Sequence, residues 1–586
     1  MSRVPVLVRF PTSQVRGRFG RLSSMRAAPS GFRSHMKVNQ ITLLHEYLER
    51  SAIRYPDKTA LVCGDRRLTW RDVDEQANRV AHTLRELGVT RGDRVLVFAE
   101  NSVETCVSIF GILKVDAIFS VISPQTKADK LAYILNDCRA RILVTDRRLD
   151  PVWRESAQKT PHLAHCLIVM GSADAPQPSA TDTVRISSFE QQVAPAPMSA
   201  PSTRNISVDL AGILYTSGST GDPMGVMLTH HNMVSAVESI TTYLQNRHDD
   251  VVIDLLPLSF DYGLYQWLMV GQFGGTLVLE KSFNYPSTAL ELIEREGVTG
   301  FPVVPTIASI LNGYAEKGVR LNGIRYVTNT AAALAGSHIA TLKKLCPKAR
   351  IFSMYGLTEC KRVAYLPPEE IHRRPDSVGK AMPNMEVYIA DDEGRRLHPN
   401  CVGELVVRGP HVMKGYWEKP EASAERLRPG DIPGEMHLYT GDLFRMDEAG
   451  YLYFVGRRDD VIKSRGEKVS PREVEDTVYS LSGVRGAAVV GEDDAVLGQA
   501  VRAYVVLEEG SGYTSKQVIQ HCAQKLEGFM VPKYVTFLSS LPQTSSGKLT
   551  KKNIDQWARE TYVAGDPCPD SSDPSDGPIS STKFVA

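Results

Sequence analysis

The chain has 586 residues, of which 42% are hydrophobic and 23% charged, and its formal net charge is +1. This composition excludes collagen-like, coiled-coil and wholly disordered chains, and the balanced charge gives no reason to expect nucleic acid or an anionic membrane as the main partner. At about 150 residues per domain, the length predicts one large or split domain and at least one smaller domain.

The beginning of the chain differs in composition from the rest. Residues 1–45 contain seven Arg, one Lys and no Asp or Glu, and three prolines interrupt any helical period there. We therefore expect an Arg-rich disordered extension over 1–40. Its composition resembles that of a transit peptide, whereas Ser34-His35-Met36 suggests a cloning junction or an alternative start.

Helical and strand patterns alternate from about Leu43 onward. Apolar residues recur at helical spacing after Leu44 and Val80, and short apolar runs are typical of strands over 59–63, 67–69, 94–98, 117–121 and 141–145. The apolar run 106–124 is interrupted by Lys114 and Asp116, so we expect a buried helix and strand rather than a membrane span. The alternation predicts an α/β fold with doubly wound, largely parallel sheets.

Beyond residue 459 the pattern changes to that of a compact α+β module. It consists of a helix over 471–481, a further helix, and strands over 487–490, 500–507 and 534–537. The tail over 565–586 is rich in Asp, Pro and Ser, which predicts disorder.

The nine cysteines are scattered and include no C-x-x-C pair. An odd number at irregular spacing argues against a disulfide framework and a structural zinc site. This usage indicates a reducing compartment, so we expect a cytoplasmic protein.

A loop rich in Gly, Ser and Thr follows an apolar run that ends near Tyr215. It offers hydroxyl and amide donors to oxyanions, and its glycines allow close backbone approach. The spacing is not that of a Walker loop. We predict a polyphosphate site formed by Thr216, Ser217, Gly218, Ser219, Thr220 and Gly221.

Four further motifs follow in order along the chain. They are Tyr355-Gly-Leu-Thr-Glu359, Tyr439-Thr-Gly-Asp442, Gly456-Arg-Arg-Asp-Asp460 and Thr544-Ser-Ser-Gly-Lys548. With the loop at 213–225, they closely resemble the motifs of the adenylate-forming superfamily, which includes acyl-CoA synthetases, amino-acid adenylation domains and luciferases. The resemblance covers about residues 43–560 and implies a ligase that uses ATP and Mg²⁺.

The resemblance also implies a domain organisation. An N-terminal adenylation core with a β-subdomain would span 41–458, and a small mobile C-terminal domain would span 459–564. In this family the small domain rotates about a hinge after adenylation. Asp459 matches the hinge, and Gly466 matches the loop that approaches the thiol acceptor.

The family resemblance implies a role for residues of these motifs. Lys548 would stabilise the charged transition state in which a carboxylate attacks the α-phosphate of ATP. The remaining roles are adenine stacking by Tyr355, an α-phosphate contact from Thr358, Mg²⁺ binding by Glu359, ribose binding by Asp442, and a ribose or phosphate contact from Arg457. Taken singly, such residues are more often turn, cap or solvated side chains.

Two departures from the family pattern concern ATP and the acid. Met224 replaces the usual lysine of the phosphate loop, which predicts weaker ATP binding. Thr330 and Ala331 replace a Gly-Gly pair, which suggests a narrower acyl pocket.

The run Ser259-Phe-Asp-Tyr-Gly-Leu264 gives the main indication of specificity. We expect Phe260, Asp261, Tyr262 and Gly263 to line the substrate pocket. Asp261 matches the aspartate that accepts the α-ammonium in amino-acid adenylation domains, but it could instead pair with a group of the protein or cap a helix. Lys361 and Arg362 either contact an anionic part of the substrate or face solvent, and we expect at least one to face solvent.

The sequence therefore predicts a carboxylic acid–thiol ligase that forms an acyl-adenylate and pyrophosphate, then transfers the acyl group to coenzyme A or to the phosphopantetheine of a carrier protein. One alternative is an amino-acid-specific enzyme that loads a stand-alone carrier protein. Others are activation of an unusual acid such as nitrite for N–N bond formation, and a non-catalytic nucleotide-binding relative.

Overall fold

The structure is a computed structural model. It describes residues 41–170, 184–217, 223–281, 283, 285–330, 334, 336–458, 460, 462–465, 467–494, 496–543, 549–551 and 553–561. The predicted extension over 1–40 and the predicted tail over 565–586 lie outside these residues.

The largest sheet has fourteen strands. They are β1 (Thr59–Cys63), β2 (Arg66–Thr69), β10 (Val251–Asp254), β11 (Thr276–Leu279), β12 (Gly300–Val303), β13 (Tyr326–Asn329), β14 (Arg350–Leu357), β15 (Cys360–Tyr365), β16 (Ser377–Ala381), β17 (Glu386–Ala390), β18 (Val402–Arg408), β20 (Leu427–Pro429), β21 (Met436–Met446) and β22 (Leu452–Arg457). Strands β1, β11, β10, β12, β13 and β14 run parallel. From β15 onward the pairings are antiparallel, and these strands form the predicted β-subdomain.

The second sheet has eight strands in the order β19-β9-β8-β4-β3-β5-β6-β7. They are β3 (Arg94–Phe98), β4 (Ile118–Ile122), β5 (Ile142–Asp146), β6 (His165–Val169), β7 (Arg185–Ser188), β8 (Leu210–Ser217), β9 (Pro223–Thr229) and β19 (Gly415–Tyr416). The strands from β8 to β7 are parallel, and β9 and β19 are antiparallel additions at one edge.

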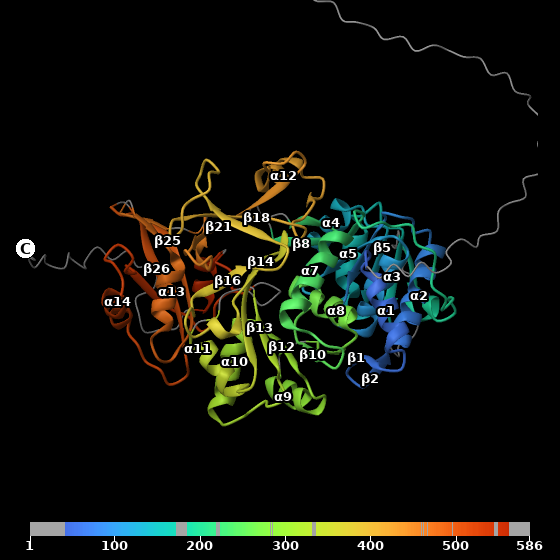
Figure 1. The fold of residues 1–586 in the computed structure, drawn as a ribbon, viewed down its shortest axis with the longest axis horizontal. Helices are drawn as coiled ribbons and strands as arrows, with labels where there is room; N and C mark the ends of the chain where they lie inside the picture. Colours follow the sequence, from blue (N-terminus) through green and yellow to red (C-terminus); the bar gives the residue numbers. More distant parts are fainter. Residues whose placement is uncertain are drawn as a thin grey trace, which may run out of the picture. The chain divides into compact units, whose positions relative to one another are not determined.

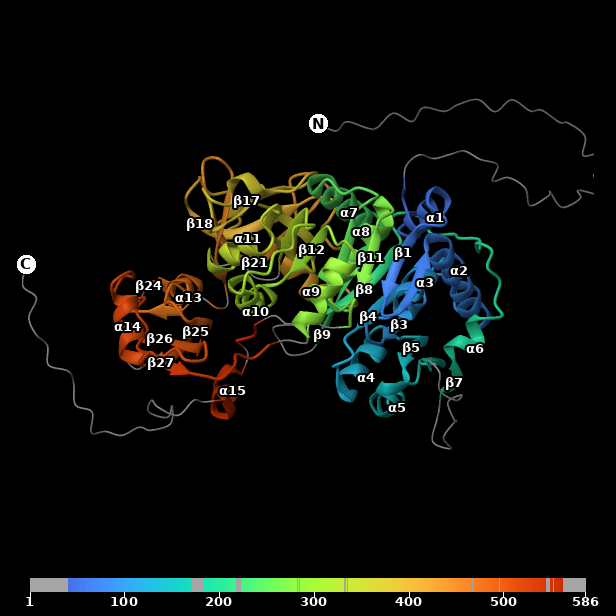
Figure 2. The same cartoon turned by 90° about the horizontal axis from the view of Figure 1, so that it is seen from below.

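Helices cover both faces of these sheets (Figures 1 and 2). They are α1 (His45–Arg54), α2 (Trp70–Glu86), α3 (Val103–Lys114), α4 (Ala128–Asp137), α5 (Asp150–Ala157), α6 (Phe189–Val193), α7 (His230–Leu244), α8 (Asp261–Phe273), α9 (Pro286–Arg295), α10 (Pro305–Glu316), α11 (Gly336–Leu345) and α12 (Pro420–Arg426), with short 3₁₀ turns at Arg147–Leu149 and Pro368–Glu370. Helix α8 contacts α1 and α7 as well as β10 and β11, and α3 contacts β3 and β4. Helix α8 is therefore apolar around most of its circumference, as expected for a helix enclosed between layers.

The doubly wound fold predicted from the alternating pattern is confirmed. The run 106–124 forms the buried helix α3 and the buried strand β4. Lys114, which interrupts this run, is fully buried, and its Nζ lies 2.7 Å from Asp74 Oδ1 and 3.2 Å from Glu49 Oε1. No helix in the described part of the chain is both long enough and apolar enough to cross a membrane.

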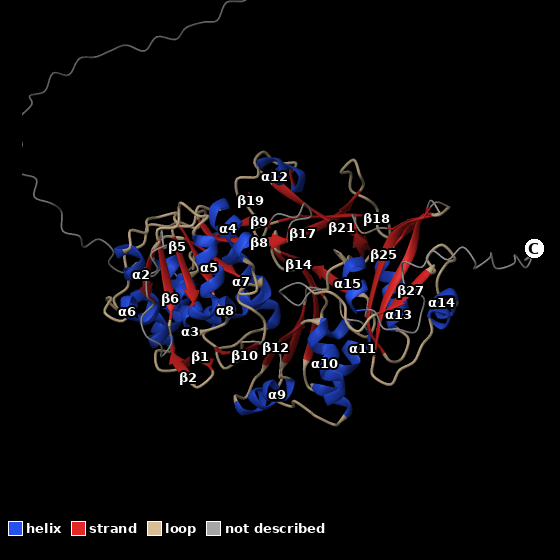
Figure 3. Ribbon diagram, turned by 180° about the vertical axis from the view of Figure 1, so that it is seen from behind, coloured by secondary structure: helices blue, strands red, loops and turns tan. Residues whose placement is uncertain are grey.

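The predicted α+β module has a five-stranded sheet of its own (Figure 3). Its elements are β23 (Ile462–Ser464), β24 (Glu467–Val469), α13 (Pro471–Tyr479), β25 (Val484–Asp494), β26 (Gly498–Leu507), α14 (Ser515–Ala523), β27 (Tyr534–Phe537) and α15 (Ile554–Thr561). Val474 and Val518 of α13 and α14 belong to one apolar cluster, whereas Ile554 and Ala558 of α15 join Tyr504 in another. The sheet is thus covered on both faces, which explains the apolar runs of β25 and β26.

Candidate active site

The predicted site residues gather where parallel strands of the large sheet end. In open α/β sheets, ligands bind at the carboxyl ends of the strands. Strands β13 and β14 are parallel neighbours, with Asn329 opposite Ser353. The predicted pocket residue Thr330, which is buried, and the predicted adenine partner Tyr355 therefore lie at the same edge.

Tyr355, Asp442 and Arg457 form one group, joined by a hydrogen bond and an ion pair. The Tyr355 hydroxyl donates to Asp442 Oδ2 at 2.5 Å, and Arg457 Nε lies 3.5 Å from Asp442 Oδ1. Asp442 and Arg457 are cross-strand partners on β21 and β22. The Tyr355 ring packs edge-on against Phe444, with centroids 4.8 Å apart. The antiparallel subdomain thus supplies the groups that hold the tyrosine in place.

Burial raises the pKa of the Asp442 carboxyl, and Arg457 and the Tyr355 hydroxyl oppose that shift. Both opposing groups favour the ionised carboxylate, by charge and by hydrogen bonding respectively. A buried carboxylate held in this way can accept further hydrogen bonds, as from a pair of ribose hydroxyls, because each carboxylate oxygen has two lone pairs.

Glu359 lies in the turn between β14 and β15, directly after the half-buried Thr358. Its backbone carbonyl accepts a hydrogen bond from Met413 N at 2.8 Å, which fixes the turn. Its Oε1 accepts a hydrogen bond from the Tyr416 hydroxyl at 2.8 Å. The negative charge of Glu359 also contributes to the raised pKa of Asp442, so the two carboxylates belong to one electrostatic site.

Two residues of this site were not predicted from the sequence. Tyr416, on β19, orients Glu359. Arg426, at the end of α12, lowers the pKa of Asp442 by its charge, and a Cβ on Gly441 would lie 2.1 Å from Arg426 Nη1. Neither residue belongs to a motif used in the sequence analysis, and only the pairing of β19 with β9 and the packing of α12 bring them here.

The phosphate loop is described only at its flanks. Thr216 lies on β8, opposite Met224 on β9, and Ser217 ends β8. The predicted residues Gly218, Ser219, Thr220 and Gly221 lie outside the described residues, as do Ala331, Asp459, Gly466 and Lys548, and their roles stay predictions.

The predicted acid-binding residues meet around the beginning of α8. Asp261 is the first residue of this helix, and its Oδ2 lies 3.1 Å from Lys361 Nζ. Lys361 is buried, with its ammonium 4.9 Å from the centre of the Tyr265 ring. Asp261 therefore pairs with a group of the protein in this structure.

Other residues of the run fix α8 against the sheet. The Tyr262 hydroxyl lies 2.8 Å from the Thr328 carbonyl and 2.7 Å from its Oγ1. A Cβ on Gly263 would lie 2.5 Å from the Pro257 carbonyl oxygen, so only glycine fits this close approach. Phe260 is buried beside Tyr262, with ring centroids 6.1 Å apart.

The prediction that Lys361 or Arg362 faces solvent is wrong, because both residues are buried. The cause is a bulge in the β14–β15 hairpin. Tyr355 pairs with Ala364 and Leu357 with Cys360, so Gly356 alone faces residues 361–363. A Cβ on Gly356 would lie 2.7 Å from Arg362 N, and Arg362 has a φ of +59°. Bulges break the alternation of side chains along a strand, and here two successive cations turn inward.

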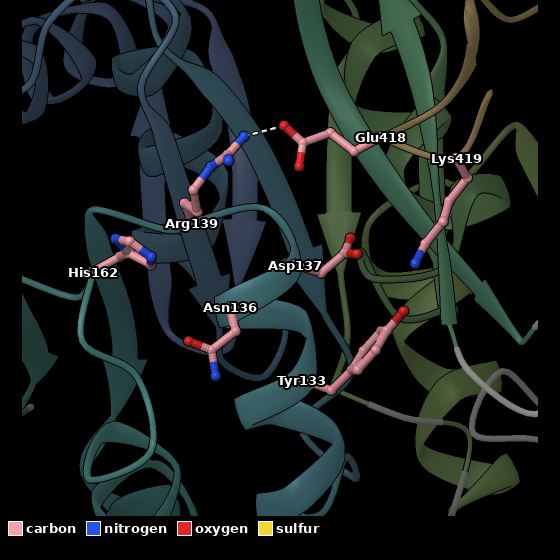
Figure 4. Close-up of a pocket in the computed structure, with 7 residues that line it drawn as sticks. All are labelled: Tyr133, Asn136, Asp137, Arg139, His162, Glu418 and Lys419. Atoms are coloured by element: carbon pink, nitrogen blue, oxygen red, sulfur yellow. Dashed lines mark hydrogen bonds and ion pairs between the residues drawn. The ribbon is translucent and has the colours of Figure 1, made fainter.

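A separate depression of about 500 Å³ lies at the end of α4. Figure 4 shows Arg139 paired with Glu418, and Lys419 and Asp137 below them. None of its lining residues belongs to a predicted motif, and it opens to solvent among charged side chains. We do not assign the chemistry to it.

Two family models match the chain. The model described as AMP-binding enzyme covers residues 48–417, and the model described as AMP-binding enzyme C-terminal domain covers residues 473–548. The chain belongs to the AMP-binding enzyme family. It is an AMP-forming acid–thiol ligase that uses ATP.

Relatives of two kinds are similar over most of this enzyme. A long-chain-fatty-acid–CoA ligase of Bacillus subtilis is 29% identical over 542 residues, which cover 89% of this chain and 95% of that protein. Gramicidin S synthase 2 of Brevibacillus brevis is 30% identical over 550 residues, which cover 92% of this chain and 11% of that protein. A crystal structure of the anthranilate CoA ligase AuaEII in complex with anthranoyl-AMP is 28% identical, with a TM-score of 0.81, and the match covers 89% of this chain and 98% of that one.

Proposed function

We propose that this enzyme converts a small carboxylic acid and ATP to an acyl-adenylate and pyrophosphate, and then transfers the acyl group to the thiol of coenzyme A or of a carrier-protein phosphopantetheine. The observation that carries the proposal is the group formed by Tyr355, Asp442, Arg457 and Glu359. It combines a ring for adenine, a buried carboxylate for ribose and an acidic turn for a metal–phosphate complex beside the acid-binding residues.

In the first step, a carboxylate oxygen of the acid attacks the α-phosphorus, the bond from phosphorus to the bridging oxygen breaks, and pyrophosphate leaves. The attacking and leaving groups are both anionic, so positive charge near the α-phosphate lowers the barrier. We assign that charge to Lys548, and we assign α-phosphate contact to Thr358. The Gly218–Gly221 loop would hold the leaving phosphates by its amides and hydroxyls.

Glu359 is suited to hold Mg²⁺. It is a carboxylate in a fixed turn, with Tyr416 bonded to Oε1. No cluster of three or more His, Cys, Asp and Glu side chains that could hold a metal occurs in the part of the chain that the structure describes. This agrees with a Mg²⁺ that takes one protein carboxylate and otherwise phosphate oxygens and water. When bound, the ion would neutralise phosphate charge.

The second step needs a thiol and a changed position of the small domain. We propose that the domain over 459–564 turns about Asp459 after adenylation and brings the loop at Gly466 toward the thiol acceptor. The thiolate sulfur then attacks the acyl carbon and AMP leaves.

The amino-acid alternative is disfavoured by one contact. An amino-acid pocket of this kind needs an aspartate available for the substrate ammonium, whereas Asp261 already has a buried ammonium partner in Lys361 at 3.1 Å. Activation of nitrite remains as an outcome of the experiment.

The test is ATP–pyrophosphate exchange over fatty, aryl, dicarboxylic and amino acids and nitrite. We expect exchange with at least one carboxylic acid, then AMP release on addition of coenzyme A or a phosphopantetheinylated carrier protein. The Lys548→Ala variant should lose exchange yet still convert supplied acyl-AMP to thioester. Background exchange with every acid, in a protein that binds ATP, would contradict the proposal.

A further inference from the structure

Arg362 is a buried cation to which no described residue supplies a matching anion. It is 2% exposed. Its guanidinium carbon lies 4.5 Å from the centre of the Tyr262 ring and Nη1 donates to Met354 Sδ at 3.2 Å, but Nε has no hydrogen-bond partner. No carboxylate among the described residues lies within ion-pair distance of it. Burial of such a charge is strongly unfavourable unless an anion compensates it.

The carboxyl groups of Asp261 and Asp254, which like Arg362 act electrostatically on tyrosines of α8, do not provide that anion. Asp261 is engaged with Lys361. Burial raises the pKa of the Asp254 carboxyl well above its usual range, which favours its neutral, protonated form and makes it a poor counter-charge for Arg362. Residues 331–333 and 335, which follow β13 in the sequence, are all alanine. The described charges around Arg362 therefore leave one positive charge in excess.

The position of Arg362 connects it to the acid. The residue lies three positions after Glu359 on the same hairpin, which limits the distance between their Cα atoms to about 11 Å. It packs on Tyr262, whose hydroxyl reaches Thr328 at the end of β13. The excess charge thus lies among the residues assigned to the acid and near the turn assigned to the phosphates.

The backbone at Arg362 is also unusual. Its left-handed conformation, with a φ of +59°, is uncommon for a residue other than glycine. Such conformations persist where the surrounding structure enforces them, and they gather at binding sites. Here the bulge opposite Gly356 enforces it, and the result is the inward direction of two successive cations.

We propose that the acid activated by this enzyme is a short dicarboxylic acid, whose second carboxylate binds to Arg362 while the first faces the α-phosphate. This inference rests on the proposed function. The planar guanidinium matches a carboxylate in geometry and charge. Lys361, which is paired with Asp261, adds a positive charge near the second carboxylate. Phe260, Tyr262 and Met354 are buried around this place, which favours a short acid over a long fatty chain.

The experiment compares acids of matched length by pyrophosphate release: malonate, succinate and glutarate against propionate, butyrate and valerate. We expect kcat/KM for the best diacid to exceed that of its matched monoacid by about 100-fold. Arg362→Met should lower kcat/KM for the diacid by about 30-fold or more, mainly through KM, and leave the monoacid within about 3-fold. Arg362→Lys should restore part of the diacid activity.

Arg350→Met is the matched control. Arg350 begins β14 and also stacks on an aromatic ring, at 5.2 Å from the centre of Phe352, so its loss should change neither class of acid selectively. Thermal unfolding shows whether Arg362→Met folds. If it does not, the proposal is tested by the diacid-to-monoacid ratio of kcat/KM in the wild-type enzyme and in Arg362→Lys.

Two results would overturn this inference alone. One is a wild-type enzyme that activates monoacids, amino acids or nitrite as well as or better than diacids. The other is an Arg362→Met variant that loses activity equally for all acids, which indicates a structural role. Failure of every acid, with ATP binding retained in calorimetry, would instead contradict the proposed function itself.

Discussion

Replacing Tyr355 with Phe removes one hydroxyl and leaves the ring that is proposed to stack on adenine. In the structure this hydroxyl donates to Asp442 Oδ2 at 2.5 Å, and it lowers the pKa of that carboxyl against the effect of burial. Its removal therefore raises the pKa of Asp442 further. Because the ionised carboxylate is the form proposed to accept the ribose hydroxyls, ATP use should fail at a higher pH in the variant.

The size of the shift follows from the type of bond. A hydrogen bond to a charged group contributes about 1.5–3 kcal/mol, and one pKa unit corresponds to about 1.4 kcal/mol. Asp442 is only 6% exposed, so solvent screens the bond little. We expect the acid limb of kcat/KM for ATP to move upward by about 1 to 2 pH units. Well above that limb, both enzymes have an ionised Asp442 and should differ much less.

The assay is initial-rate pyrophosphate release at subsaturating ATP across the pH range in which both proteins stay folded. Tyr388→Phe is the matched control, because Tyr388 is also a buried tyrosine whose hydroxyl bonds a titratable group, His437 Nδ1 at 3.0 Å, outside the proposed site. The control should leave the acid limb in place. An unmoved or lowered acid limb in Tyr355→Phe would refute the assignment of Asp442 as the group that titrates.

Three other changes test separate parts of the enzyme. Glu359→Gln keeps the size of the side chain and removes its charge. We expect kcat for adenylation to fall by about 100-fold and to depend less on Mg²⁺ in a metal titration. An unchanged Mg²⁺ titration would contradict the assignment of Glu359 to Mg²⁺ binding. Met224→Lys restores the lysine usual in the family opposite Thr216, and KM for ATP should fall about 10-fold; an equal or higher KM would show that the phosphates lie elsewhere. Lys114→Met removes the ammonium that pairs with Asp74 and Glu49. We expect the free energy of unfolding in urea to fall by about 3 kcal/mol, with KM for ATP unchanged. Unchanged stability would mean that water replaces the lost ion pairs.

The fold could be predicted well from the sequence because its signals are local. Alternating apolar runs gave the parallel strands β3, β4 and β5 close to their observed bounds, since both faces of these strands are buried and each run is nearly continuous. The elements of the α+β module after residue 459 were predictable for the same reason, as the period and the order of the elements change there.

Site residues could be predicted where they belong to a sequence motif. They could not be predicted where only tertiary packing brings them to the site. Tyr355, Asp442 and Arg457 come together as the motifs imply. Tyr416 and Arg426 were missed because a two-residue strand and the end of a short helix deliver them, and neither has a periodic pattern around it. The error at Lys361 and Arg362 has a sharper cause: strand alternation predicts opposite faces for successive residues, and only the bulge opposite Gly356 abolishes that rule.

In the proposed function, the hairpin of β14 and β15 links recognition of the nucleotide to recognition of the acid. Tyr355 lies on β14, before the turn, and Glu359 lies in the turn. Lys361 and Arg362 follow on β15. The chain limits the distances between these groups, so an acid at the proposed Arg362 site and a nucleotide at the proposed Tyr355 site would not move independently. Gly356 controls both, because it is adjacent to Tyr355 and makes room for Arg362. A side chain at position 356 should therefore raise KM for ATP and for the acid together, whereas a hairpin that only supported the nucleotide would leave KM for the acid unchanged.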